Sequence, residues 1–166
     1  MEMNAPFEEA VARHGPTVLR VCRATLGAGA DADDAWSETF LAALRAWPEL
    51  DEATNVEAWL VRVAGRKSID VIRGRNRRAL PSDELPEKVS TVGTPGGDHD
   101  VWSAVAALPQ RQRLALAYHH LGGLTHAQTA DLLGSSPAAV RRAAADGMKQ
   151  LRRMYRTGES GKGALR

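Results

Sequence analysis

The sequence predicts an all-α protein in which two small helical domains are joined by a flexible linker that contains Pro and Gly. Three observations support this fold class. No stretch alternates apolar and polar residues as a strand does, and clusters of β-branched and aromatic residues are sparse. The candidate helices are separated by glycine, proline and N-cap residues. The segment 79–98 is too rich in Pro and Gly for a regular helix or a packed core.

Residues 1–78 are predicted to form the first domain, which holds three helices. Gly27 and Gly29 stop the first helix, and Pro48 ends the second, because proline disfavours the helical conformation of the residue before it. Asn55 is a good N-cap for the third helix. The predicted ranges are 6–26, 31–47 and 56–76.

The linker separates this domain from a second one at 99–156, and the tail 157–166 is predicted to be disordered. The single cysteine, Cys22, cannot form an internal disulfide, and its apolar neighbours predict a buried side chain without a catalytic role. No signal pattern or apolar run of membrane-spanning length is present, so we expect a cytoplasmic protein with no membrane partner.

The net charge of +2 conceals a strong segregation along the chain. Residues 1–100 carry 12 basic and 17 acidic side chains, whereas residues 101–166 carry 10 and 3. Within the first domain, an acidic block at 31–57 is followed by a basic block at 59–78. Basic blocks favour nucleic acid as a partner, and the acidic block favours a protein with a basic surface. Either block taken alone is also compatible with a solvated face.

The most specific local motif lies between Thr125 and Arg142. A helix-turn-helix needs a small residue where its helices touch, a glycine in the turn and a branched apolar anchor on the second helix. Ala130, Gly134 and Val140 supply these at the required spacing. An ordinary helical hairpin would not need that glycine, so the motif favours DNA binding.

The second helix of such a motif enters the major groove with its N-terminal residues facing the bases. Two arginines in this part can reach guanine edges or phosphates, whereas alanines offer only close approach and methyl contacts. The predicted contact residues are Ser136, Pro137, Ala138, Ala139, Arg141 and Arg142.

A line of arginines follows the predicted third helix. At about 100° per residue, four of them fall within a sector of roughly 60°. Positive charge spaced in this way suits contacts with DNA phosphates, whereas a solvated face more often interleaves acids. These residues are Arg62, Arg66, Arg73 and Arg77.

Over nearly its whole length the sequence resembles the extracytoplasmic-function (ECF) group of bacterial RNA polymerase sigma factors. DADDAWSETFL, from Asp31 to Leu41, resembles region 2.2 of that family, and Ala58 to Arg78 resembles regions 2.3 and 2.4. The segment from Ala107 to Arg142 resembles region 4, with Leu108-Pro109 and Leu124 in register. Val61, Arg66 and the second half of the recognition helix depart from the family pattern.

The resemblance implies a sigma factor that directs RNA polymerase core to promoters and helps to open the DNA. It implies that Asp31, Asp34, Glu38 and Phe40 dock on the clamp helices of the largest polymerase subunit. It adds Trp59 to the arginines as a contact of the minus-ten element, and it assigns the helix-turn-helix to the minus-thirty-five element. An anti-sigma factor is a further candidate partner.

Other functions remain open at this point. One is a sigma-like or helix-turn-helix regulator that binds DNA or polymerase without directing initiation. Another is a metal-dependent nucleic-acid enzyme, since Asp31, Asp34 and Glu38 share one helix face. No glycine-bent loop or histidine accompanies these acids, and helix N-termini attract acids in any case. The sequence therefore predicts no catalytic residues, no metal and no cofactor.

Overall fold

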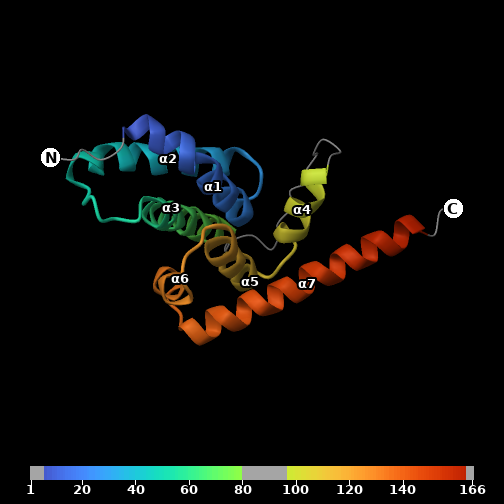
Figure 1. The fold of residues 1–166 in the computed structure, drawn as a ribbon. Coiled ribbons are helices and arrows are strands. Elements are labelled where there is room, and N and C mark those ends of the chain that lie inside the picture. Colours follow the sequence, from blue (N-terminus) through green and yellow to red (C-terminus); the bar gives the residue numbers. More distant parts are fainter. Residues whose placement is uncertain (1–5, 80–96, 164–166) are drawn as a thin grey trace.

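A computed structural model describes residues 6–79 and 97–163 of the chain. Within these two ranges every regular element is helical, which confirms the all-α fold class (Figure 1). The elements are α1 (Phe7–Leu26), α2 (Ala30–Ala46), the 3-10 turn η1 (Trp47–Glu49), α3 (Val56–Ala79), α4 (Gly97–Ala106), α5 (Gln110–Ala115), the π-helical turn η2 (Leu116–Leu121), α6 (His126–Leu133) and α7 (Pro137–Gly163). Most of the predicted linker 79–98 lies outside the described residues.

The first three helices pack on one another, as expected for residues 1–78. Helix α1 ends at Gly27, whose φ of 91° lies in the left-handed region that glycine tolerates best. The indole Nε1 of Trp36 on α2 donates a hydrogen bond of 3.0 Å to the carbonyl of Gly15 on α1. A Cβ on Gly15 would already touch this ring at 3.4 Å. Gly15 therefore lets the indole lie close to α1.

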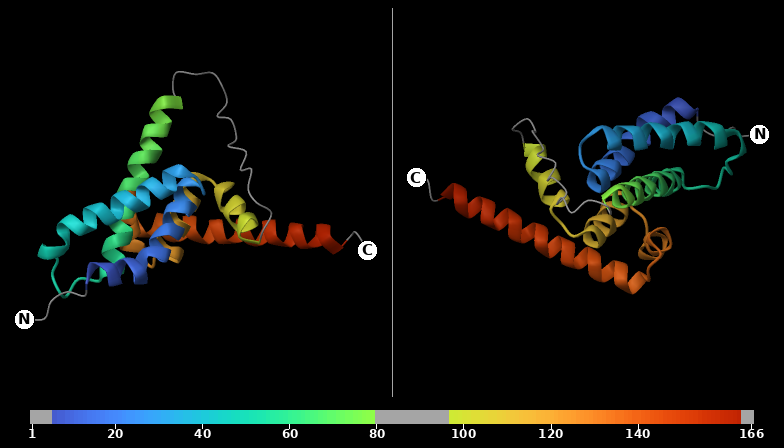
Figure 2. Two further views of the ribbon diagram at one scale, coloured as in Figure 1. Left: turned by 90° about the horizontal axis from the view of Figure 1, so that it is seen from above. Right: turned by 180° about the vertical axis from the view of Figure 1, so that it is seen from behind.

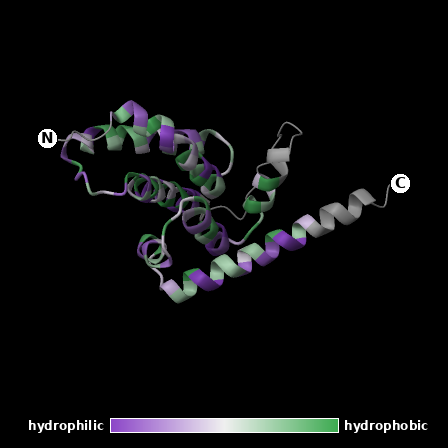
Figure 3. Cartoon of the chain, viewed as in Figure 1, coloured by the Kyte–Doolittle hydropathy of each residue, from purple (hydrophilic) through white to green (hydrophobic). Residues whose placement is uncertain are grey.

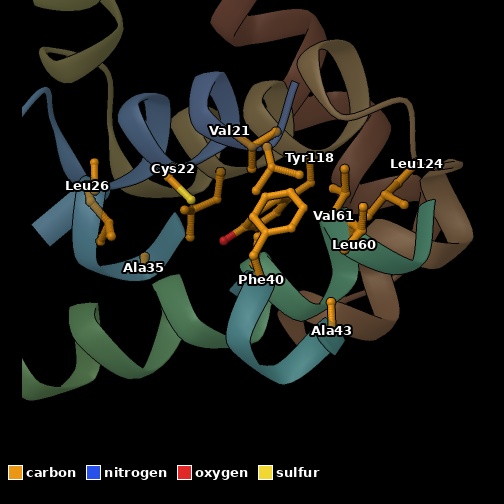
Figure 4. Close-up of a cluster of buried hydrophobic side chains, with 14 of the residues drawn as sticks. Val21, Cys22, Leu26, Ala35, Phe40, Ala43, Leu60, Val61, Tyr118 and Leu124 are labelled. Carbon is orange, nitrogen blue, oxygen red and sulfur yellow. The ribbon is translucent and has the colours of Figure 1, made fainter. Parts of the chain in front are cut away.

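Cys22 lies in the middle of this core and is fully buried (Figure 4). Burial raises the pKa of its thiol to about 12, although a hydrogen bond with Ser68 opposes the shift. The thiolate is the reactive form of cysteine, so this side chain is inert at neutral pH. The predicted buried position is confirmed.

The helix-turn-helix has the predicted internal structure. Thr125 caps α6, since its Oγ1 accepts from the amide of Gln128 at 3.0 Å while the Gln128 side chain accepts from the Thr125 amide at 2.9 Å. Gly134 ends α6 in the left-handed conformation with φ 63°. The Ser136 hydroxyl accepts from the amide of Ala139 at 3.2 Å, which leaves proline in the first turn of α7. Local capping thus determines both helix starts.

Helix α7 continues to Gly163, within the range 157–166 for which the sequence predicted a disordered tail. Leu151 and Met154 still pack against a hydrophobic cluster of the second half that includes Leu116, Val140 and Ala144. Extending a formed helix costs far less than nucleating one, which favours continuation of the helix into this range. The result is a long helix that projects from the body, with hydrophilic and hydrophobic residues interspersed along it (Figures 2 and 3).

The two predicted domains pack together through a shared hydrophobic cluster, and the second half also has a cluster of its own. Tyr118 and Leu124, from the second half of the chain, are buried in the same cluster as Cys22, Leu60 and Val61 from the first half (Figure 4). Helix α1 contacts η2, α4 and α5 across this boundary, and α3 contacts α6. The sequence predicted two domains joined by a flexible linker and gave no indication of this contact between them.

Two glycines permit the close approach of the halves. A Cβ on Gly122 would lie 2.6 Å from Val61 Cγ1 and 2.9 Å from the Tyr118 carbonyl. A Cβ on Gly65 would overlap a methyl group of Leu132 on α6. The Tyr118 hydroxyl donates to the carbonyl of Gly65 at 3.4 Å, and burial raises the pKa of this phenol. In this structure the first helix of the helix-turn-helix therefore lies directly against α3.

Candidate nucleic-acid interface

The arginine stripe occupies the exposed side of α3. Arg66, Arg73 and Arg77 are exposed, whereas Arg62 is half-buried near the start of the helix. The opposite side of α3 is buried in the shared core and carries Leu60, Val61, Ala64 and Ile72. Packing of that apolar side fixes the rotation of α3, so the three exposed guanidinium groups are presented to solvent together.

Trp59 is half-buried and packs against the shared core. Because one part of the Trp59 ring packs against the core, only the rest of the ring can contact a nucleic acid. This side chain therefore links the basic surface of α3 to the packing of the first three helices.

Arg75 belongs to the same helix but not to the stripe. Its guanidinium donates from Nε to the Asp31 carboxylate at 3.1 Å and from a terminal nitrogen to the Leu26 carbonyl at 3.1 Å. This arginine thereby ties α3 to the turn between α1 and α2. Sequence analysis did not identify Arg75 as a structural residue. Its position on the helix, outside the sector of the other arginines, indicated that it faces the protein.

The acidic helix α2 presents only some of the residues predicted to bind polymerase. Asp34 and Glu38 are exposed, and Asp31 is half-buried in its ion pair with Arg75. Two leucines on the same helix, Leu41 and Leu44, remain 54% and 50% exposed, which is unusual for such large apolar side chains. The exposed face of α2 therefore combines negative charge with apolar area, as protein interfaces do.

Phe40 requires a correction, because the sequence had placed it on this docking face. It is only 6% exposed and belongs to the core. Its ring packs against Trp36 with a centroid separation of 4.6 Å and against Phe7 at 6.4 Å. Helical periodicity turns Phe40 inward and Leu41 outward. Leu41 is the residue that sequence analysis missed, three positions after Glu38.

The N-terminal end of α7 presents the predicted base-reading residues. Ser136, Pro137, Ala138, Arg141 and Arg142 are exposed, and Ala139 is half-buried. Val140 is 2% exposed and anchors the helix against Ala130, as the motif predicted. One turn after Arg142, the carboxylate of Asp146 is also exposed. The structure therefore brings both arginines to one surface and leaves an acid beside them.

Arg113 is half-buried near the junction of the halves. Its Nε is buried without a hydrogen-bond partner. Desolvation is the main cause that lowers the pKa of this guanidinium, and repulsion from Arg75 lowers it further. A cation held in this way opposes the close packing of α5 against the first half of the chain.

No three His, Cys, Asp or Glu side chains in the described parts of the chain gather in a way that could hold a metal ion. Asp31, one of the acids considered for such a site, is instead bound to Arg75. Over the same residues, no helix is both long and apolar enough to cross a membrane.

Comparisons with known proteins match both halves of the chain. Residues 10–78 match the family Sigma-70 region 2, and residues 98–151 match Sigma-70, region 4. The chain is 33% identical over 154 residues to the ECF RNA polymerase sigma factor ShbA of Streptomyces griseus, covering 82% of this chain and 81% of ShbA. It is 34% identical over 139 residues to the ECF RNA polymerase sigma factor SigD of Mycobacterium tuberculosis, covering 76% of this chain and 66% of SigD.

Solved structures show the same fold. The sigma factor RpoE of Bartonella quintana, crystallised with the anti-sigma factor NepR, superposes with a TM-score of 0.70 at 17% identity, over 90% of this chain and 96% of RpoE. CnrH, in complex with the cytosolic domain of CnrY, gives a TM-score of 0.59 at 23% identity, over 91% of this chain and 88% of CnrH. The two matched regions, in this order along the chain, and the sequence relatives ShbA and SigD assign the protein to the sigma-70 family. It belongs to the ECF group of promoter-specific sigma factors that direct RNA polymerase.

Proposed function

We propose that three surfaces of this sigma factor bind three different partners or DNA elements. The exposed face of α2 docks on the clamp helices of the largest polymerase subunit, the arginines of α3 hold the minus-ten element, and the start of α7 contacts the minus-thirty-five element. The observation that carries the proposal is the simultaneous exposure of an acidic and apolar face on α2 and an arginine stripe on α3, two helices packed on each other. A helix-turn-helix regulator that never directs initiation would need neither face.

The docking surface on α2 consists of Asp34, Glu38, Leu41 and Leu44. Leucine side chains that leave water at an interface contribute most of the favourable free energy, whereas rim carboxylates steer a basic partner. Asp31 contributes indirectly, because its ion pair with Arg75 holds the start of α2 against α3. Phe40 supports α2 from the core side.

The minus-ten surface consists of Arg66, Arg73 and Arg77, with Arg62 and Trp59 at its half-buried end. Exposed arginines at helical spacing fit the phosphates of one strand, and each neutralised phosphate releases counterions. The minus-thirty-five surface relies on Arg141 and Arg142 for base contacts. Ser136 acts there mainly as the cap that fixes the first turn of α7.

The halves of the chain must separate for both promoter elements to be bound at once. The names of the elements place them about 25 base pairs apart, which is roughly 85 Å of duplex at about 3.4 Å per base pair. In this structure α6 lies directly against α3, since Leu132 contacts Gly65. We therefore assign the shared core to a closed state of the free chain.

Two further expectations belong to the proposal. RpoE and CnrH were each solved with a bound partner, an anti-sigma factor in the case of RpoE. A partner of that class would fit the exposed leucines of α2, which the free chain leaves in water. We also infer that the protein works in the cytoplasm beside RNA polymerase and catalyses no reaction itself.

Run-off transcription with purified core polymerase on a library of upstream regions tests the proposal. The variant Asp34→Arg with Glu38→Arg should lose both transcription and co-purification with core enzyme while its helical content is unchanged. The control variant, Glu8→Arg with Glu52→Arg, makes the same change in net charge at exposed positions off α2. Equal core binding by both variants would refute the docking assignment.

A further inference from the structure

Three histidines gather where η2 leads into the helix-turn-helix. His119 and His120 end the π-helical turn, and His126 is the first residue of α6. The rings of His119 and His126 stack with centroids 4.0 Å apart and an interplanar angle of 22°. The His120 ring meets His119 edge-on at 4.9 Å. Because His120 is exposed and the other two are only half-buried, core packing does not account for this cluster.

One hydrogen bond identifies the nitrogen that is free to take a proton. Nδ1 of His119 lies 2.7 Å from the carbonyl oxygen of Leu124. A carbonyl can only accept, so Nδ1 carries the hydrogen and donates it. The lone pair of the neutral ring then lies on Nε2. Protonation at Nε2 keeps the bond to Leu124 and converts the ring into a cation with a second donor.

The charged groups that act on the cluster are all positive. Desolvation lowers the pKa of His126, and the charges of His119, Arg141 and His120 lower it further. The pKa of His120 is lowered by desolvation and then by His119. These charges come from η2 and α7. Helices α1 and α5 pack against η2, and α3 packs against α6, but none of them contributes a charge to these two shifts. His120 and His126 therefore resist protonation, and an anion beside them would favour it.

We propose that His119 and His126, together with Arg141, bind a phosphate of the DNA backbone and take up a proton when they do so. In a helix-turn-helix the first helix crosses the backbone while the second enters the groove. His126 starts the first helix, and Arg141 lies near the reading end of the second. A phosphate between them offsets the mutual repulsion of the cations, so DNA binding and protonation favour each other.

The inference rests on the proposed function only in that the helix-turn-helix contacts DNA. Uptake of one proton raises the association constant by at most about tenfold for each unit of pH below the pKa of the complex and above that of the free chain. One additional phosphate contact also steepens the salt dependence of binding by about 0.9 in log–log slope. Both effects are measurable without polymerase.

The experiment uses the full chain and a fluorescent duplex of arbitrary sequence. Anisotropy titrations run from about pH 8 to about pH 6, the range in which histidine titrates, at constant ionic strength. Wild-type affinity should rise several-fold more than that of His126→Gln over this range. His14→Gln is the matched control, because His14 pairs with Glu57 in the first half of the chain and should keep the wild-type response.

A second variant guards against a structural artefact. His126→Arg carries a permanent charge, so it should bind at pH 8 more tightly than the wild type does, with a flatter pH profile than the wild type. An equally steep profile in His126→Gln and the wild type, or no pH response in the wild type, would overturn the inference. Run-off transcription at pH 8 tests the proposed function separately: a chain that fails to initiate but keeps the His126-dependent response contradicts only that function.

Discussion

Gly122→Ala should weaken the contact between the two halves of the chain. The backbone of Gly122 has φ −87° and ψ −14°, which alanine adopts without strain, so the cost is purely steric. The new methyl group would lie 2.6 Å from Val61 Cγ1 and 2.9 Å from the Tyr118 carbonyl. Val61 can shift, whereas a carbonyl in a helical turn cannot.

Overpacking of this kind costs about 1–3 kcal/mol, and the stiffer unfolded chain of an alanine variant returns up to about 1 kcal/mol. The net loss of about 1–2 kcal/mol lowers the melting temperature by about 2–8 °C for a chain of this size. Thermal unfolding followed by circular dichroism measures the loss. Small-angle X-ray scattering shows whether the halves separate, because separation increases the radius of gyration before any helix melts.

Gly74→Ala is the internal control for this experiment. Gly74 lies inside α3, and a Cβ there would meet only the end of the Arg78 side chain at an ordinary 3.7 Å. The same chemical change should therefore stabilise the protein by up to about 1 kcal/mol through helix propensity. If Gly122→Ala matches Gly74→Ala in melting temperature and leaves the radius of gyration unchanged, the shared core does not exist in solution.

Two further predictions concern charge. Arg73→Ala with Arg77→Ala should weaken promoter binding by the polymerase complex for every sequence and lower its salt slope by about two units. The control Arg13→Ala with Arg20→Ala, at exposed positions on α1, should do neither. A loss confined to one promoter would mean that Arg73 and Arg77 read bases. The pKa values of His120 and His126 lie below the ordinary 6.5, so the unfolded chain binds more protons and stability falls as the pH drops below about 6.5. Melting temperatures should decline from about pH 7.5 to about pH 5.5, and less so in His126→Gln; an equal decline in both would contradict the assignment.

Local rules explain what the sequence predicted correctly. Helix starts at Thr125 and Ser136 depend on side chains that bond to amides three residues away, and the turn at Gly134 depends on one residue. The arginine sector of α3 also depends only on helical periodicity. Such features need no knowledge of the rest of the fold.

Contacts between distant segments explain what the sequence could not predict. Gly65 and Gly122 have no side chain, so no hydropathy pattern marks them, yet each contacts an apolar residue of the other half. Phe40 and Leu41 are apolar neighbours on α2, and contact with the Phe7 ring of α1 shows which of them is buried. The shared core and the choice of residues exposed on α2 therefore follow from tertiary packing.

Asp146→Arg should tighten DNA binding without regard to sequence. Asp146 interrupts a basic row on α7, because Arg142 lies four residues before it and Lys149 three residues after it, and all three side chains are exposed. A carboxylate in this row repels the phosphate that its neighbours attract.

Arginine at position 146 removes the repulsion and adds one phosphate contact, so the salt slope should steepen by about 0.9. Arg141→Ala should act differently: it should erase sequence preference, at about 1–3 kcal/mol if the guanidinium pairs bidentately with a guanine. Competition binding of the full chain to promoter and random duplexes separates the two effects. Glu52→Arg, an exposed charge reversal outside the second half, is the control for net charge. Should Asp146→Arg and Glu52→Arg raise affinity equally, long-range charge and not this row on α7 limits binding, because a direct phosphate contact depends on position whereas a general field does not.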